Sequence, residues 1–479
     1  MSDDGYRSPL GIRYASPAMQ RLWGEPRRIG LWRRIWLALA ESEHDLGLAV
    51  PEEGLAQMRQ HLDDADPAAA AAYERQFRHE VMAHVHHFGD QAPAARPIIH
   101  LGATSAFVTD NADVLLIRDG LRILLGRLLA TLGVLADFAR ARAGLPCLAY
   151  THFQPAQLTT VGKRACLWLQ DFALDVEEVC HRLDTLRLRG CKGTTGTQAS
   201  FLELFKGDHA KVRELERRIV RRLGLERVFA ATGQTYPRKA DSAVLDLLSG
   251  IAQSAAKMAT DLRLLQHEGE LLEPFEQDQI GSSAMAYKRN PMRAERICGL
   301  ARFVISLQAN AANTAATQWL ERSLDDSANR RLSLPEAFLA SDAILILTTN
   351  IAAGLEVRET VIRSHVDEQM PFMATERWLM LGVEAGGDRQ ALHEAIRRHS
   401  QAAAEGVGRG EANVLLERLA ADRTFAKIPT HRLQTELDPG RYTGRAEQQV
   451  GEFLDEYLLP LLAKARPYAA EAGQTEVLV

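Results

Sequence analysis

Residues 281–291 have the composition of an anion-stabilising loop. They read Gly-Ser-Ser-Ala-Met-Ala-Tyr-Lys-Arg-Asn-Pro and lie between two apolar helical patterns. Glycine and paired serines allow backbone N–H groups to converge on an anion, while Lys288 and Asn290 add a positive charge and hydrogen-bond donors. Such a loop can stabilise the negative charge that develops when a proton is removed from the carbon beside a carboxylate.

Long helices are predicted to position this loop, because the central part of the chain is poor in proline. Only three of the 18 prolines, Pro237, Pro274 and Pro291, lie between residues 156 and 334. A proline inside a helix removes a hydrogen bond and clashes with the preceding turn, at a cost of about 3 kcal/mol. Strand signals are sparse, so the sequence predicts an all-α fold.

Apolar residues in the same region recur at helical spacing. Between residues 111 and 143 they form one stripe, which predicts a helix of about 50 Å with Asp110 or Asn111 as its cap. Similar patterns predict further helices over residues 29–46, 238–273 and from Met292 onward. Several long helices of this kind are typical of an elongated bundle.

Proline and glycine content divides the chain into three helical units. Pro51 and Pro67 flank polar segments near the N-terminus, and turn-forming residues return at Pro371 and Gly386. We therefore predict an N-terminal helical domain (1–104), a central long-helix bundle (105–357) and a C-terminal helical domain (358–479).

The composition limits the kind of partner and compartment. A formal net charge of −5 gives no bulk attraction to nucleic acid or anionic lipid. Five cysteines without CxxC spacing indicate reduced thiols, and the acidic N-terminus lacks the pattern of a secretory signal. Polar residues interrupt the apolar stretch 337–355, so we interpret it as a buried helix rather than a membrane span. We expect a cytoplasmic protein that binds small molecules, neither nucleic acid nor membrane.

Two other patterns are weak. Gly406, Gly408 and Gly410 resemble a dinucleotide-binding loop, but no strand pattern precedes them and the third glycine is misplaced. His79, His84, His86 and His87 lack HExxH spacing and a nearby set of acidic ligands, so no metal site is indicated.

Residues 281–291 resemble the signature loop GSSxMPxKxNP of the fumarase/aspartase superfamily of lyases, except that Ala286 occupies the proline position. Two more segments resemble superfamily motifs, at residues 100–105 (HLGATS) and 151–157 (THFQPAQ). Within the superfamily the chain resembles the adenylosuccinate lyase family, in its animal-like branch, from Ser8 to the C-terminal region. The segments that carry this resemblance are 8–16 (SPLGIRYAS), 78–84 (RHEVMAH), 192–200 (KGTTGTQAS) and 324–331 (LDDSANRR).

The resemblance implies β-elimination of fumarate. The family converts adenylosuccinate to AMP, and succinyl-aminoimidazole-carboxamide ribotide to aminoimidazole-carboxamide ribotide, in purine biosynthesis. It implies that His152 is the general acid that protonates the leaving nitrogen, and that Ser282 is the base, with Ser283 as the competing candidate. Lys288 and Asn290 match the residues that stabilise the carboxylate and the carbanion.

The remaining matches concern the substrate. His79 matches a substrate-side catalytic histidine, and the other implied substrate contacts are Arg13, Tyr14, Arg78, Glu80, Thr104, Ser105, Gln234, Arg296, Arg322, Ser327 and Arg331. Glu80 departs from the usual aspartate, so its carboxylate reaches one methylene further. The resemblance also implies a homotetramer with active sites built from several subunits, and it implies no metal or organic cofactor.

Two alternatives remain open at this point. Another lyase or a cycloisomerase of the superfamily would share the loop, but not the segments around Arg13, Arg78 and Arg322. A catalytically silent helical scaffold would share the fold, but would have no reason to retain His152 and Ser282.

Overall fold

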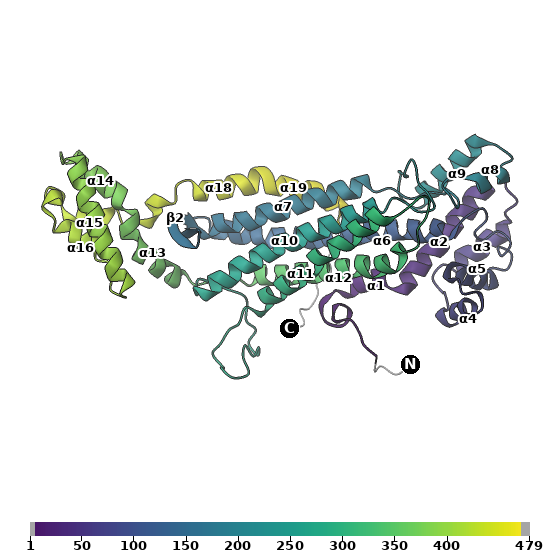
Figure 1. Cartoon of the computed structure of the whole chain (residues 1–479), viewed down its shortest axis with the longest axis horizontal. Coiled ribbons are helices and arrows are strands. Elements are labelled where there is room, and N and C mark those ends of the chain that lie inside the picture. Colours follow the sequence, from purple (N-terminus) through teal and green to yellow (C-terminus); the bar gives the residue numbers. More distant parts are fainter. Residues whose placement is uncertain (1–4, 471–479) are drawn as a thin grey trace.

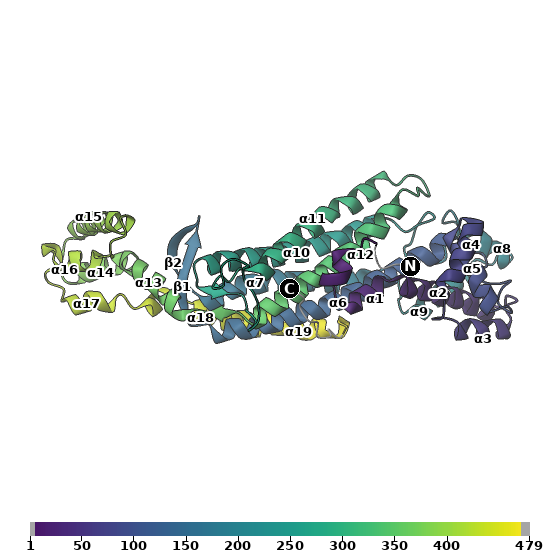
Figure 2. The same ribbon diagram turned by 90° about the horizontal axis from the view of Figure 1, so that it is seen from below.

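The computed structural model describes residues 5–470 as an elongated molecule built almost entirely from helices (Figures 1 and 2). Residues 1–4 and 471–479, which the predicted domain limits include, lie outside the described residues. The centre of the molecule is a bundle of long helices that run roughly along its long axis. They are α6 (Ser105–Ala141), α7 (Val161–Thr185), α10 (Lys239–His267), α11 (Met292–Thr317) and α12 (Asp326–Ala353). The predicted all-α, long-helix architecture is confirmed.

The N-terminal part forms one end of the molecule. After the short π-helix η1 (Leu10–Tyr14), it contains α1 (Pro17–Trp23), α2 (Glu25–Asp45), α3 (Glu52–Gln60), α4 (Pro67–Phe77) and α5 (Glu80–Gln91). Two helices from the middle of the chain, α8 (Ala199–Leu204) and α9 (His209–Arg222), join it, and α9 packs on α2.

Helix α6 begins earlier than its apolar stripe predicts. It starts at Ser105, so Asp110 and Asn111, the predicted caps, lie inside the helix. Both side chains have tertiary partners instead: Arg238 donates to Asp110, and Asn111 donates to the carbonyl oxygen of Gly190. The predicted cap was therefore wrong, because these polar groups are satisfied by other segments of the fold.

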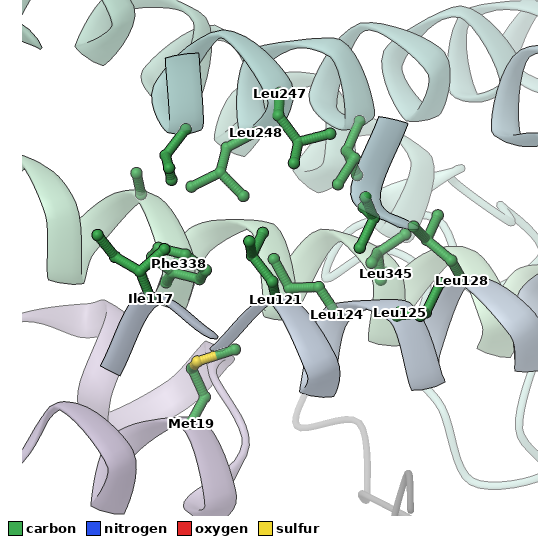
Figure 3. Packing of buried hydrophobic residues seen from close by; sticks show 14 of the residues in the cluster. Met19, Ile117, Leu121, Leu124, Leu125, Leu128, Leu247, Leu248, Phe338 and Leu345 are labelled. Atoms are coloured by element: carbon green, nitrogen blue, oxygen red, sulfur yellow. The ribbon is translucent and has the colours of Figure 1, made fainter. Parts of the chain in front are cut away.

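The bundle core contains the predicted leucine stripe of α6. Leu121, Leu124, Leu125 and Leu128 are fully buried, and Figure 3 shows them among side chains of α10 and α12. The helices approach closely at Gly120, where an added Cβ would lie 2.8 Å from the Phe338 ring. A side chain at this position would therefore force the two helices apart.

Two short antiparallel strand pairs, of which the first is a hairpin, interrupt the helical pattern in the described residues. Strands β1 (Pro146–Thr151) and β2 (Gln154–Thr160) pair directly after α6, with a register shift between Leu148 and Tyr150. Strands β3 (Leu271–Leu272) and β4 (Glu356–Val357) join the C-terminal ends of α10 and α12. Figure 2 shows the first hairpin projecting from the bundle near α13.

The C-terminal part has a hydrophobic core of its own and then returns to the bundle. Its core joins buried side chains such as Trp378, Leu392 and Leu433. Its elements are α13 (Glu359–Met373), α14 (Thr375–Glu384), α15 (Arg389–Gly408), α16 (Leu415–Ala420), η2 (Arg423–Phe425), α17 (Thr430–Thr435) and η3 (Pro439–Tyr442). The last helices then pack along α7 (Figure 1); they are α18 (Ala446–Glu452), η4 (Phe453–Leu458), α19 (Leu459–Ala465) and η5 (Arg466–Tyr468). The boundaries at 104/105 and 357/358 stay predictions.

Helix α12 alone among the described helices is long and apolar enough to span a membrane. Its most apolar window has a mean hydropathy of 1.4, and 72% of that window is buried inside the molecule. The sequence argument that this stretch is too polar to span was wrong, but the predicted buried helix is confirmed.

Glu43 on α2 provides a test of the N-terminal packing. Its carboxyl group is fully buried without a hydrogen-bond partner in residues 5–470, and burial raises its pKa to about 9. The folded chain keeps this proton, whereas the unfolded chain releases it above its ordinary pKa of 4.5. Stability should therefore fall as pH rises between these two values.

We expect Glu43→Gln, which stays neutral, to remove this dependence. As the pH rises from 6 to 8, the unmodified chain should lose about 3 kcal/mol of unfolding free energy relative to the variant. Denaturant titrations of both proteins at the two pH values measure the difference. Parallel pH dependence of the two proteins would contradict a protonated Glu43.

Candidate active site

The signature loop, residues 281–291, connects α10 to α11 and hangs below the bundle in Figure 1. Gly281 is buried and packs on the backbone of Lys288, so an added Cβ would lie 2.0 Å from the Lys288 carbonyl oxygen. The Asn290 side chain donates to the Gly281 carbonyl oxygen at 2.8 Å. These contacts close the loop at its base and leave its tip, including Lys288, exposed.

Ser282 has a specific environment within this loop. Its hydroxyl oxygen accepts hydrogen bonds from the backbone N–H groups of Ala284 at 3.3 Å and Met285 at 3.2 Å. The neighbouring Ser283 side chain is exposed. Two oriented N–H donors stabilise negative charge on an oxygen, which lowers the cost of forming an alkoxide.

Ala286, which departs from the family loop, supports a prediction about flexibility. Alanine leaves the open loop more conformations than proline, a difference of roughly 0.4 to 1 kcal/mol if the native angles suit proline. We expect Ala286→Pro to keep turnover and to slow proteolytic cleavage of the loop, measured by limited digestion. Ala284→Pro is the control, because it removes an N–H donor to Ser282 and should lower turnover. Unchanged proteolysis of Ala286→Pro would contradict the entropic account.

His152 lies at the tip of the hairpin formed by β1 and β2. Thr151 pairs with Gln154, so His152 and Phe153 form a two-residue turn, with φ values of 53° and 57°. Such a left-handed turn matches the twist of the two strands, although it is unfavourable for residues other than glycine, asparagine and aspartate. The turn presents both side chains to the surface, and Phe153 is 81% exposed.

A second group of site residues gathers at the N-terminal end of α6. His79 caps α5: its Nδ1 accepts from the backbone N–H of Met82 at 3.3 Å, and its Nε2 lies 3.5 Å from Ser105 Oγ. Accepting at Nδ1 places the proton of a neutral imidazole on Nε2, which then points toward Ser105 as a donor. Thr104 is the N-terminal cap residue of α6, and Arg78 ends α4 with a φ of 50°.

Glu80 connects this group to an arginine of α12. One carboxylate oxygen lies 2.8 Å from Arg28, and the other forms a short ion pair with Arg331. Burial opposes ionisation of Glu80, but the two arginines hold its pKa below the usual value. The longer glutamate side chain therefore reaches two cations, and Arg28, which no sequence motif indicates, joins the group.

Gln234 and Arg322 lie at the same end of the bundle. The backbone N–H of Gln234 donates to the Glu321 carbonyl oxygen at 2.9 Å. Arg322 donates to Asp326 at 3.0 Å, one turn along, and Ser327 lies in the first turn of α12. These contacts hold the Gln234 backbone against residue 321 and the Arg322 side chain at the first turn of α12, the helix that carries Ser327 and Arg331.

Arg13, Tyr14 and Arg296 form a third location. The guanidinium of Arg296 lies 5.5 Å from the centre of the Tyr14 ring. The segment after η1 is tied to the middle of α12, since the N–H of Ser16 donates to Asp342 at 2.7 Å. Tyr14 and Arg296 therefore meet, and Arg13 precedes Tyr14 in η1, away from the N-terminal end of α6.

The fold keeps the site residues of one chain apart. Ser105 starts α6, while the hairpin with His152 follows its C-terminal end; a helix of 37 residues separates these ends by about 55 Å. Likewise Gln234 precedes α10 and the signature loop follows it, so 29 residues separate them by about 43 Å. A small substrate cannot contact both ends of one bundle.

Neither a metal centre nor the cavity beside β2 coincides with the predicted site. The described residues contain no group of three or more His, Cys, Asp or Glu side chains that could hold a metal ion. A cavity of 830 Å³ lies between β2 and the C-terminal part, and its walls include Arg377, Glu436 and Tyr442. None of the predicted site residues lines this cavity.

Comparisons with known proteins identify the family. A family model described as Lyase matches residues 38–306, and one described as Adenylosuccinate lyase C-terminus matches residues 371–453. Adenylosuccinate lyase of Saccharomyces cerevisiae is 51% identical over 94% of both chains, and that of Schistosoma mansoni is 48% identical over 95% of this chain and 96% of the relative. The chain belongs to the adenylosuccinate lyase family. This confirms the family and the lyase class predicted from the sequence.

Solved structures support the fold of this adenylosuccinate lyase family member. The 3-carboxy-cis,cis-muconate lactonizing enzyme from Pseudomonas putida aligns with a TM-score of 0.80 and 22% identity, over 96% of this chain and 99% of the other. A fumarate lyase from Mesorhizobium sp. BNC1 aligns with a TM-score of 0.78 and 23% identity, over 95% and 99%. At such identities the likeness concerns the fold alone, and it confirms the predicted fold class, an all-α chain with a central long-helix bundle.

Proposed function

We propose that this chain releases fumarate by β-elimination from adenylosuccinate, giving AMP, and from succinyl-aminoimidazole-carboxamide ribotide, giving aminoimidazole-carboxamide ribotide. Identity of about half over nearly the full length of adenylosuccinate lyases is the observation that carries this proposal. The substrates are purine nucleotides and their precursors, and the enzyme acts in the cytoplasm without a metal or organic cofactor.

The proposed reaction begins with removal of a proton from the succinyl carbon beside a carboxylate. Ser282, as its alkoxide, takes this proton, and the electron pair moves into the carboxylate. The N–H donors of Ala284 and Met285 support this role for Ser282 rather than Ser283. Lys288 then stabilises the dianionic carboxylate, since its positive charge lies on the same loop.

The second step breaks the carbon–nitrogen bond. The electron pair returns to form the double bond of fumarate, and the nitrogen leaves with its bonding pair. His152 donates a proton to this nitrogen, which prevents expulsion of a strongly basic anion. Asn290 keeps the loop closed through its bond to Gly281, and so acts on the carbanion by placing the backbone donors around it.

The remaining residues hold the substrate. His79 contacts the substrate at the reacting centre. The succinyl group accepts hydrogen bonds from Thr104, Ser105 and Gln234. The nucleotide is contacted by Arg78 and Glu80. The phosphate is bound by Arg13, Tyr14, Arg296, Arg322, Ser327 and Arg331, because arginine side chains offer forked donors to phosphate oxygens.

Each active site is shared between subunits of a homotetramer. Support for this comes from the length of α6, since one chain places Ser105 and His152 about 55 Å apart. Subunits packed antiparallel would bring the hairpin of one chain to the helix ends of another. Closed symmetric assemblies of this kind repeat the same site in every subunit.

A direct assay tests the proposed function. Purified protein is mixed with adenylosuccinate, and AMP and fumarate are followed together by chromatography. We expect the two products in equal amounts, and the same stoichiometry with the carboxamide ribotide substrate. A folded protein that releases neither product would favour the catalytically silent scaffold, and release of fumarate from argininosuccinate alone would favour another lyase.

A further inference from the structure

Arg189 is a fully buried arginine outside the predicted site. Its guanidinium donates to the carbonyl oxygen of Gln234 through Nε at 2.6 Å. The two terminal nitrogens donate to the carbonyl oxygens of Gly190 at 3.3 Å and Gly193 at 2.6 Å. No carboxylate forms an ion pair with Arg189 within residues 5–470, so a buried cation is satisfied only by main-chain oxygens.

These carbonyl oxygens belong to two segments, around residues 190–193 and 234. Both segments take part in close backbone contacts, which also include residue 321. An added Cβ at Gly196 would lie 1.9 Å from the Thr232 carbonyl oxygen, and one at Gly233 would lie 2.5 Å from the Glu321 carbonyl oxygen. Neither position has space for a side chain. The segments around residues 190–196, 232–236 and 321 therefore form one packed junction.

The peptide groups of Gln234 are held on both sides in this junction. Its N–H donates to Glu321, its carbonyl oxygen accepts from Arg189, and the N–H of Tyr236 donates to Asp110 at 2.8 Å. Of these contacts, that of Arg189 is the shortest and the only one from a charged donor. The bonds of Arg189 and Asp110 are both charge-assisted, and such hydrogen bonds are about twice as strong as neutral ones.

We propose that Arg189 is a positioning residue, which fixes the main chain of Gln234 so that its side chain meets the succinyl group. This inference rests on the proposed function. A planar guanidinium with five donors suits carbonyl oxygens from separate segments, whereas a lysine ammonium lacks that fork. Burial opposes this charge and holds the pKa of Arg189 below its usual value, and the three carbonyl oxygens offset that cost.

A double-mutant cycle separates positioning from general stability. We expect Arg189→Lys to lower kcat/KM for adenylosuccinate about tenfold, mainly through KM. In a Gln234→Ala background the same change should cost no more than about twofold, because the side chain through which Arg189 acts is already absent. AMP, which lacks the succinyl group, should inhibit Arg189→Lys as it inhibits the unmodified enzyme.

Arg33→Lys is the matched control. Arg33 is also buried and donates to a main-chain oxygen, that of His61, but contacts none of the predicted site residues. The Arg33→Lys variant should have a lower melting temperature than the unmodified enzyme and an unchanged kcat/KM. If Arg189→Lys fails to fold, Gly233→Ala displaces the Gln234 backbone by another route, and the same selective loss of succinyl binding is expected.

The outcomes distinguish the inference from the function on which it rests. No fumarate from the unmodified enzyme would overturn the proposed function. The positioning role would be overturned if the unmodified enzyme is active but Arg189→Lys lowers kcat/KM by the same factor with and without the Gln234 side chain. Equal weakening of AMP and adenylosuccinate binding would overturn it as well.

Discussion

Replacing His152 by asparagine is expected to lower kcat for adenylosuccinate cleavage by about 10²- to 10⁴-fold, because the leaving nitrogen loses its proton donor. Asparagine suits this test, since it tolerates the left-handed backbone that residue 152 adopts, and the hairpin turn should therefore survive. Substrate binding should change far less than turnover. Steady-state kinetics on both purine substrates measure the two effects.

His181→Asn is the matched control for this experiment. His181 is an exposed histidine on α7, outside the predicted site, and its replacement should leave kcat unchanged. Retention of kcat within about threefold in His152→Asn would remove His152 from the role of general acid. A loss confined to KM would instead assign His152 to substrate binding.

The backbone at His152 bears on the same question. Two adjoining residues other than glycine with positive φ are unfavourable by roughly 1–2 kcal/mol each. The paired strands before and after the turn hold it in this conformation, since Thr151 pairs with Gln154. The turn presents an exposed histidine and phenylalanine. Local strain at an exposed tip is consistent with a functional turn.

The long helices were predictable because their signals are local. Residues three and four apart define the leucine stripe of α6, and the absence of proline permits its length. The start of α6 was not predictable, because Asp110 and Asn111 bond to Arg238 and Gly190, which are distant in sequence. The hairpin around His152 was missed because Pro146 and Pro155 lie within its strands, and proline is a signal against a strand.

The motifs predict candidate site residues, and these identities stay predictions, whereas the arrangement of these residues in space could not be predicted. A motif carries residue types and spacing, and it contains no information that α6 places Ser105 and His152 at opposite ends. Arg28 and Arg189 carried no signal at all, because a single arginine is usually a solvated side chain. Their contacts with Glu80 and Gln234 become evident only when distant segments meet.

Mixing two inactive variants should restore activity, and this is the prediction that most directly tests a shared active site. Ser282→Ala lacks the base and His152→Asn lacks the acid, so each alone should lose most of its turnover. If the acid and the base of one site come from different chains, random mixed tetramers contain some sites with both residues intact. Equal mixing should then give about one quarter of the unmodified activity.

This prediction rests on where each chain carries residues 152 and 282, the two positions that are mutated. Hairpin and signature loop both follow C-terminal ends of long helices, at the end of the bundle remote from Ser105 and Gln234. A substrate held at the Ser105 and Gln234 end of a chain must receive its acid and base from neighbouring chains, and nothing requires both from the same neighbour. Subunits are exchanged by mild denaturation and refolding, and activity is compared with each variant refolded alone.

A second mixture makes the result specific. His152→Asn mixed with the double variant His152→Asn/Ser282→Ala contains no intact acid, so it should stay inactive after the same treatment. Recovery in that control would indicate contamination or a dispensable His152. A lack of recovery in the first mixture, with mixed tetramers verified by mass spectrometry, would mean that the acid and the base belong to one chain. The hairpin and the loop would then have to close on each other within a single subunit.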